Sequence, residues 1–349
     1  MATVNDTSVI GPESRPVSYR TTGATAIGLI AGAATDAVFG DPKRHHPVAW
    51  FGSWALWLEK HLYQDSIGRG ALFTATALAP VAAIGLAADR LTRNHPLARA
   101  ALTATATWAV LGGHSLASEG NQMADELADD DIAAARDRLT HLCSRNPENL
   151  DAAELARGTV ESLAENTSDA VVCSLFWGSA AGIPGLLLHR AINTLDAMVG
   201  YHNPRYENFG KASAIVDDVA AYIPARLSGA ISSALAPTIG GSAQNAWRVM
   251  MRDARNHPSP NGGWCEAAWA GALGTHLGGA SDYHGRIEER PRLGDPDTPS
   301  PDVRTIKRAS RLVGAVTAAS AVLAAMGSVV VGAIRAGRSR RWVALRSRI

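Results

Sequence analysis

Three carboxylates stand four residues apart in the sequence, at Glu161, Glu165 and Asp169. At 100° per residue, helical positions four apart drift by only about 40°, so one helix would present all three along one face. Asn166 lies beside them. Such oxygen ligands suit Mg²⁺, which binds through one or two carboxylates together with substrate phosphates. A solvated acidic face is the alternative, but an apolar run over residues 170–188 follows at once and favours the metal site.

A second polar stretch, HRAINTLDAMVGYHNPRYENFGK, follows the apolar run. Asn193 and Asp196 are three apart, so a helix would place them on one face, where they could orient an amine or serve as its base. A loop broken by Asn-Pro and Gly then carries Arg205, Tyr206 and Lys211. Cationic groups on a loop opposite carboxylates are typical of phosphate recognition. The alternative is a surface loop with ordinary ion pairs.

Two adjacent acids, Asp217 and Asp218, follow on a stretch that continues to Arg226. Neighbouring residues on a helix point in different directions, so at most one of the two acids should share a site with Arg226. We assign that role to Asp218, and expect Arg226 to neutralise phosphate beside it.

The segment NHPSPNGGWCEAAW starts at residue 256 as a loop and leads into a helix of small residues. Ser259, Asn261 and the glycines could wrap an anion with backbone N–H groups. His257 alone is weak evidence, and we group it with these substrate contacts. Glu266 lies in the first turn of the predicted helix, where the macrodipole favours an acid, so a structural role is sufficient to explain it.

The loop GDPKRHHP over residues 40–47 is rich in turn formers, since it holds a glycine and two prolines. Asp41 and His46 are its candidate site residues. We expect them to close the site over a bound substrate.

Composition and missing motifs exclude several classes of protein. Lys and Arg number 33 and Asp and Glu 32, a formal charge of +1, so no basic field points to nucleic acid. The three cysteines are far apart and form no CxxC, which argues against a disulfide framework or a zinc site. The sequence has no GxxxxGK[ST], GxSxG, HExxH or GxGxxG motif, so the nucleotide loops and hydrolase signatures that these define are absent.

Several long stretches have little or no charge and about the length that a bilayer core requires. We predict an all-α polytopic integral membrane protein with four to five membrane helices, amphipathic helices and long polar loops. Residues 170–188 either cross or form a buried re-entrant segment. A soluble protein with buried Ala-rich helices is the alternative on hydropathy alone. The four predicted spans are residues 23–40, 70–88, 100–118 and 312–334.

The predicted domain organisation is a disordered tail over 1–21, one membrane-embedded catalytic domain over 22–334 and a basic tail over 335–349. The polar site region of the domain covers 119–310, and its residues 285–305 are predicted as a long Pro-rich loop. If the loops of the site are cytoplasmic, the C-terminal tail lies outside. Its arginines argue for the inside, so the sequence leaves the topology open.

Four sequence blocks together resemble the CobD/CbiB family of adenosylcobinamide (phosphate) synthases. They are GDPKRHHPVAWFG, ESLAENTSDAVVCSLFWG, HRAINTLDAMVGYHNPRYENFGKASAIVDDVAAYIPARL and HPSPNGGWCEAAWAGALGTHLGGASDYHG. The resemblance covers about residues 24–334, and AENTSD, NTLDAMVGY, DDV…PARL and HPSPN are its specific motifs. Two positions depart from the family pattern: Ser174 replaces a usual proline, and Ile215 replaces an arginine that commonly precedes the acidic pair.

The resemblance implies an integral, largely helical protein of the cell membrane that crosses it several times. The implied activity is ATP-dependent amide formation, which joins a carboxylate of adenosylcobyric acid to (R)-1-aminopropan-2-ol or its phosphate. Mg²⁺ is expected with ATP as co-substrate, and membrane lipid and later membrane enzymes of cobalamin biosynthesis are expected partners. Two alternatives share the scaffold: a transporter with the polar stretch as its path, and a non-catalytic membrane sensor.

The hypothesis for the site assigns each candidate residue one of three roles. The catalytic residues are Glu165, Asn193, Asp196 and Asp218. The metal ligands are Glu161, Glu165 and Asp169. The substrate or phosphate contacts are Asp41, His46, Asn166, Arg205, Tyr206, Lys211, Arg226, His257, Ser259 and Asn261.

Overall fold

The computed structural model describes residues 19–41, 46–283 and 286–346, which are mostly helical. The α-helices are α1 (Tyr19–Phe39), α2 (Pro47–Leu62), α3 (Ile67–Thr92), α4 (Pro96–Leu111), α5 (Gly113–Ala128), α6 (Ile132–Leu142), α7 (Ala152–Asn166), α8 (Ser174–Ala181), α9 (Ile183–Val199), α10 (Lys211–Leu235), α11 (Ala243–Asp253), α12 (Gly262–Leu273) and α13 (Val303–Arg346). The remaining elements are a π-helix, η1 (Thr167–Cys173), two 3₁₀-helices, η2 (Ala236–Ile239) and η3 (Ala254–Asn256), and the strands β1 (Leu277–Tyr283) and β2 (Arg286–Leu293).

Three helices of the described chain are long and apolar enough to cross a membrane, which confirms the prediction of a helical membrane protein. The candidate spans are Thr21–Phe39 in α1, Ile67–Thr92 in α3 and Val303–Gly337 in α13. The tail predicted over 1–21 lies outside the described residues apart from the start of α1. At the other end of the chain, the residues predicted as a basic tail continue α13 as far as Arg346.

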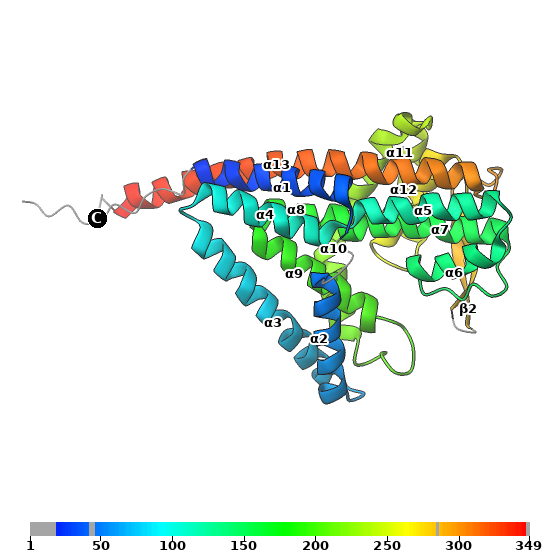
Figure 1. Ribbon diagram of the computed structural model, residues 1–349, viewed down its shortest axis with the longest axis horizontal. Helices are drawn as coiled ribbons and strands as arrows, with labels where there is room; N and C mark the ends of the chain where they lie inside the picture. The colour runs from blue at the N-terminus through cyan, green and yellow to red at the C-terminus, as the bar shows by residue number, and fades with distance from the viewer. Residues whose placement is uncertain (1–18, 42–45, 284–285, 347–349) are drawn as a thin grey trace, which may run out of the picture.

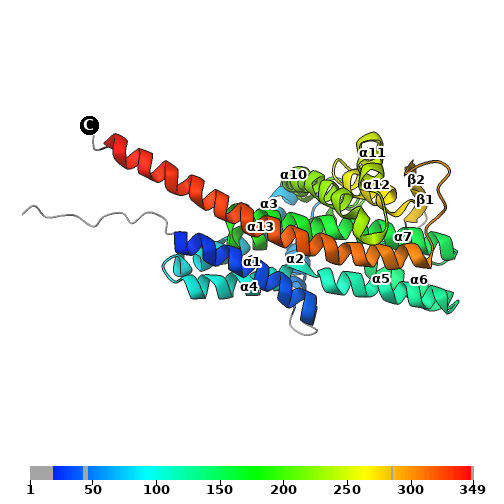
Figure 2. The same cartoon turned by 90° about the horizontal axis from the view of Figure 1, so that it is seen from above.

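Helix α13 runs along the long axis of the molecule in both views (Figures 1 and 2) and contacts helices at both ends, such as α1 and α5. Its 44 residues span about 66 Å, roughly twice the thickness of a bilayer core. In its first half Ile306, Leu312 and Val316 are fully buried, whereas Met326 and Val330 in its second half are more than half exposed. The first half therefore packs into the helical body that holds α5, α7 and α12, and the second half presents an apolar surface suited to lipid.

The span predicted over residues 100–118 is divided in the structure. Gly112 adopts a left-handed conformation, with φ 69°, and separates α4 from α5. Helix α4 packs closely against α1, where a Cβ on Gly28 or Gly32 would collide with Thr103 or Thr107. Small residues four apart allow this close approach of helices, as in membrane helix pairs. The prediction of one continuous span was wrong because the absence of charged residues does not show that a single glycine, Gly112, ends the helix.

The prediction of a Pro-rich loop over residues 285–305 is wrong for residues 286–293, which form β2. β1 and β2 form an antiparallel hairpin in which Leu277 pairs with Leu293 and Gly279 with Arg290. A bulge between Leu277 and Gly279 interrupts the register. Gly278 and Gly279 supply the positive φ that this bulge requires. The Pro-rich composition of the segment did not indicate a hairpin.

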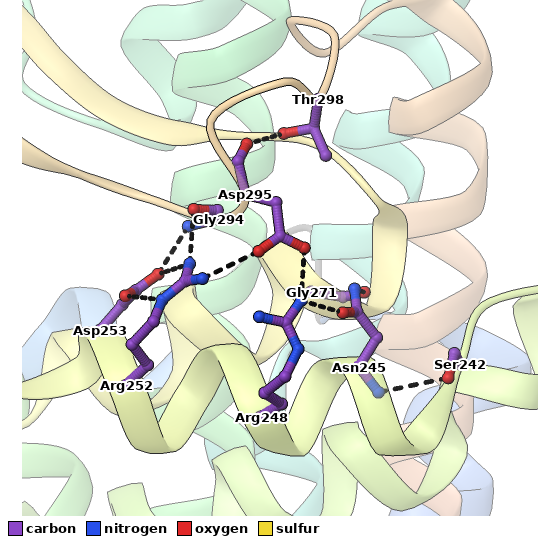
Figure 3. A network of polar contacts seen from close by, with 9 residues as sticks. All are labelled: Ser242, Asn245, Arg248, Arg252, Asp253, Gly271, Gly294, Asp295 and Thr298. Carbon is purple, nitrogen blue, oxygen red and sulfur yellow. Dashed lines mark hydrogen bonds and ion pairs between the residues drawn. The ribbon is translucent and has the colours of Figure 1, made fainter.

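The turn after β2 is fastened to α11 by the polar network of Figure 3. Arg252 spans Oδ1 of Asp253 at 2.6 Å and Oδ1 of Asp295 at 2.9 Å, and Arg248 donates to Oδ2 of Asp295 at 2.5 Å. The backbone N–H of Gly294 donates to Asp253 at 2.9 Å. Because Asp253 is buried, the network stabilises the end of the hairpin against the body that carries α12.

Candidate active site

The apolar run over residues 170–188 turns back on itself, which answers the question that the sequence left open. It forms the end of η1, then α8, then a turn at Gly182 with φ 68° and ψ −145°, and the start of α9. Oγ of Ser174 lies 3.2 Å from Nδ1 of His189, so the two arms of this hairpin pack antiparallel. The hairpin returns the chain from the acidic motif to the second polar stretch and brings Asp169 close to Asp196.

Acidic side chains from three elements converge at the open end of the hairpin: Asp169 on η1, Asp196 on α9 and Asp217 on α10. Burial and the charge of Asp217 raise the pKa of Asp169 well above its ordinary value. Burial and the charge of Asp218 raise the pKa of Asp196 to about 6. Burial and the charge of Asp196 raise the pKa of Asp217 to about 7. Such crowding of buried like charges is typical of functional sites.

Two residues that the sequence hypothesis left out, Arg190 and Asp217, belong to this cluster. Arg190 has two carboxylates near it. Burial lowers the pKa of its guanidinium, and the negative charges of Asp41 and Asp169 act against this effect. Its Nη1 donates to Oδ1 of Asn193 at 3.3 Å. The sequence hypothesis assigned Asp218 to the site and left out Asp217, but the pKa of each carboxyl is raised by its surroundings. The proximity of Asp217 to Asp196 depends on the packing of α10 near α9, which the sequence does not show.

Glu161 is not placed to bind a metal ion. Its Oε2 accepts from Nη2 of Arg145 at 2.6 Å and its Oε1 accepts from the N–H of Gly278 at 2.7 Å, both in the protein interior. At 1.5 Å per residue it stands about 12 Å along the axis from Asp169, too far for one ion to contact both. The described residues contain no group of three His, Cys, Asp or Glu suited to a metal. Glu161 therefore fastens the β-hairpin to α7.

Glu165 and Asn166 sit where α7 passes into the π-helix, a local form frequent at functional sites. Burial and the charge of Glu266 raise the pKa of Glu165. The side-chain amide of Asn166 donates to the carbonyl of Ser162 at 2.9 Å and more weakly to that of Leu142 at 3.4 Å. The structure thus places Glu165 at the site and gives the amide of Asn166 a local role in holding the helix.

Asp41, at the start of the first loop, lies near the site, because its carboxylate interacts electrostatically with Arg190. Nε2 of His46 lies 3.7 Å from Oδ1 of Asp41, and the N–H of Asp41 donates to Oγ of Ser115 at 3.3 Å. Burial opposes ionisation of Asp41, but its bonds to His46 and Ser115 outweigh burial and lower its pKa. Nδ1 of His46 caps α2 at the N–H of Val48. These two predicted residues are brought together beside the cluster, and the loop between them lies outside the described residues.

Arg205 and Tyr206 are directed elsewhere, so their assignment to phosphate does not fit the structure. Both donate to Oε1 of Glu59 on α2, at 2.8 and 3.0 Å, and the Arg205 guanidinium lies 4.2 Å from the ring centre of Tyr63. The ion pair therefore fixes residues 200–210 to α2. Glu59 is 146 residues away from Arg205 in the sequence, so no local pattern could predict this pairing. Lys211 is the exposed first residue of α10.

The remaining predicted contacts gather where α10 meets the start of α12. Nδ2 of Asn261 donates to the carbonyl of Asp218 at 2.9 Å and to its Oδ1 at 3.3 Å. Oδ1 of Asn261 accepts from Arg226 at 3.4 Å. His257 is buried, with Nε2 3.3 Å from Oε1 of Glu266. Its pKa is raised, because Glu266 outweighs the opposing effect of burial. Asn261 thus contacts both Arg226 and Asp218, the two residues that the sequence hypothesis assigned to one site.

Comparison with known proteins identifies the family. The model of the CobD/Cbib protein family matches residues 29–313. A relative from Mycobacterium tuberculosis named "Cobalamin biosynthesis protein CobD" is 48% identical over 302 residues, which cover 86% of this chain and 95% of the relative. Relatives of the same name from Geobacter metallireducens and Chromobacterium violaceum are 43% and 39% identical, over 80% and 89% of this chain and 89% and 99% of theirs. No solved structure matches the chain significantly. The chain therefore belongs to the CobD/CbiB family of cobalamin biosynthesis proteins.

Proposed function

We propose that this protein is a ligase of the cell membrane that forms the amide between a carboxylate of adenosylcobyric acid and (R)-1-aminopropan-2-ol or its phosphate, at the expense of ATP. The observation that carries the proposal is the convergence of Asp169, Asp196 and Asp217 at the hairpin, with Arg190 among them. Amide formation needs a base for the amine and counter-charges for phosphate, and this cluster supplies both kinds of group.

The chemistry divides into two steps that the residues can serve. A carboxylate is unreactive toward amines, so ATP first transfers its terminal phosphoryl group to the substrate carboxylate and ADP leaves. The amine then attacks the acyl carbon, the C–N bond forms, and phosphate leaves. The amine must lose a proton, which Asp196 is suited to accept, because with a pKa of about 6 it is mostly ionised at neutral pH. Asn193 and Arg190 are placed to orient the reacting groups.

Glu165 and Asp169 fit the Mg²⁺ that is expected with ATP. They stand four residues apart at the junction of α7 and η1, and both offer carboxylate oxygens, the ligand type that Mg²⁺ prefers. Two protein ligands are sufficient, since Mg²⁺ completes its shell with water and substrate phosphates. When bound there, the ion would neutralise phosphate charge.

The direct test incubates the purified full-length protein in detergent with adenosylcobyric acid, Mg²⁺–ATP and either amine, and follows the products by mass spectrometry. We expect adenosylcobinamide or its phosphate to appear with an equal amount of ADP, and to disappear when EDTA is added. Failure to form an amide from either amine would reject the proposal. Uptake of unmodified corrinoid by vesicles that contain the protein would favour the transporter alternative instead.

A further inference from the structure

A hollow of about 390 Å³ lies between α10 and the segment that leads into α12. Its lining residues include Arg226, Arg255, His257, Ser259, Tyr222 and Trp264, and none of its lining residues carries a carboxylate. The hollow is therefore electropositive, although it adjoins an acidic cluster. An anion is the ligand class that such a lining selects.

Arg226 is held in place without being neutralised. Its guanidinium lies 3.6 Å from the ring centre of Tyr222 and 4.8 Å from that of Trp264. Its N–H groups donate to uncharged oxygens: the carbonyls of Tyr222 and Pro260 and the side chain of Asn261. Neither Arg226 nor Arg255 forms an ion pair with the described residues. A planar fork held between rings retains its charge for a ligand and is suited to bidentate contact with phosphate.

The floor of the hollow is a fixed turn. The N–H of Ser259 donates to Nδ1 of His257 at 3.0 Å, and Oγ of Ser259 accepts from the N–H groups of Asn261 and Gly262 at 3.3 and 3.1 Å. Because Oγ accepts both of these bonds, the hydroxyl hydrogen of Ser259 is free to be donated to a ligand. A turn fixed in advance lowers the entropy cost of binding.

We propose that this hollow binds the phosphate group of a substrate, with Arg226, Arg255 and Ser259 as its contacts. The inference rests on the proposed function. It combines Arg226 and Ser259, both candidates from the sequence, with Arg255 in one pocket and leaves out the loop of Arg205. Asn261 connects the hollow to the cluster, because it contacts both Arg226 and Asp218. The phosphate belongs either to ATP or to the phosphorylated amine, two sources with the same chemistry.

The test measures binding directly on the full-length protein in detergent. Isothermal titration with pyrophosphate, ATP and aminopropanol phosphate is compared for the wild type, Arg226→Gln, Arg255→Gln and the matched exposed control Arg304→Gln. We expect both hollow variants to weaken binding of at least one phosphate ligand about tenfold or more, as loss of a charge-assisted contact does. The control should bind as the wild type does. Arg226→Lys, which keeps the charge but loses the fork, should fall between.

The pattern of losses identifies the source of the phosphate. Weakened ATP binding alone points to the nucleotide, and weakened binding of aminopropanol phosphate alone points to the amine. Unchanged affinity for all three ligands in both hollow variants, or no binding by the wild type, would overturn the inference. The two proposals can fail separately. If the wild type binds phosphate but forms no amide, only the proposed ligase activity is rejected. If the wild type forms the amide but both hollow variants bind phosphate normally, only the assignment of the hollow is rejected.

Discussion

At the scale of single residues, the charge state of the converging carboxylates links the site to pH. Asp196 has a pKa of about 6, so it is mostly ionised at pH 7 and can accept the proton of the amine. Asp217, with a pKa of about 7, holds a proton over much of the neutral range. Burial and neighbouring carboxylates thus raise the pKa of both aspartates toward neutral pH. Each of the two carboxyls yields one prediction.

Amide formation should follow the ionisation of Asp196. We expect kcat to rise with pH through about 6 in the wild type, since the protonated carboxyl cannot accept the amine proton. Asp196→Asn should lower kcat by about 100-fold or more and remove this limb of the profile. The measurement is a pH profile of turnover at saturating substrates. An Asn variant that retained both the rate and the limb would show that another group is the base.

Asp217 should destabilise the folded protein above neutral pH. Its carboxyl has a pKa of about 7 when folded and an ordinary value of 3.8 when unfolded, so between these values the folded state binds more protons. Stability due to this group is thus complete below pH 4 and decreases as pH rises toward 7. Asp217→Asn should raise the unfolding temperature at pH 8, by about 2 °C or more, and should have a smaller effect at pH 5.

This comparison is made by thermal unfolding in detergent without divalent cations, so that bound metal does not change the carboxyl pKa. Asp129→Asn, an exposed substitution at the end of α5, serves as the matched control. A variant of Asp217 that is less stable than the wild type at pH 8 would contradict the assignment.

At the scale of elements, the hairpin of α8 and α9 creates the site. The sequence allowed a re-entrant segment over residues 170–188, and it predicted helices at the acids of α7 and α10 and at the small residues of α12. It could not predict the partner of Glu161, because Arg145 lies in a loop with no helical phase relative to it. Likewise, the ion pair of Arg205 with Glu59 depends on tertiary packing rather than on spacing.

Gly182 is the element-scale test, because its φ of 68° with ψ of −145° belongs to a region that only glycine occupies readily. Gly182→Ala should cost about 1–3 kcal/mol of stability and lower kcat about tenfold or more by shifting Asp169 relative to Asp196. The control is Gly240→Ala, also at positive φ but at the end of η2, away from the hairpin. Equal losses of activity in the two variants would show that the hairpin turn has no special role.

At the scale of the whole molecule, the helices separate a lipid-facing part from a polar body. The end of α13 near its C-terminus lies at the same end of the molecule as the start of α1 and the turn between α3 and α4, and α5, α6 and α7 lie at the opposite end (Figures 1 and 2). Hydropathy identified α1, α3 and α13 as spans from sequence. It could not orient them, because arginines occur at both ends of α13.

The arrangement predicts that Asn94 and Asp129 lie on opposite sides of the membrane. Each is replaced singly by Cys in a protein that also carries Cys143→Ser, since Cys143 is the one native thiol among the three that is not buried. An impermeant maleimide should then label one of the two variants in intact cells and the other only in inverted vesicles. Labelling of both from the same side would contradict the orientation of α3 and α13 in the structure.

The central claim is that the acidic motif on η1 and the polar stretch on α9 and α10 form one catalytic site. Its most direct test is the ATP-dependent turnover of adenosylcobyric acid by Asp169→Asn, with Asp129→Asn as control and unfolding temperatures measured on the same samples. We predict that Asp169→Asn loses about 100-fold or more in kcat while it remains folded, and that the control keeps full activity. Turnover by Asp169→Asn within threefold of the wild type, about 0.7 kcal/mol in the barrier, would contradict the account.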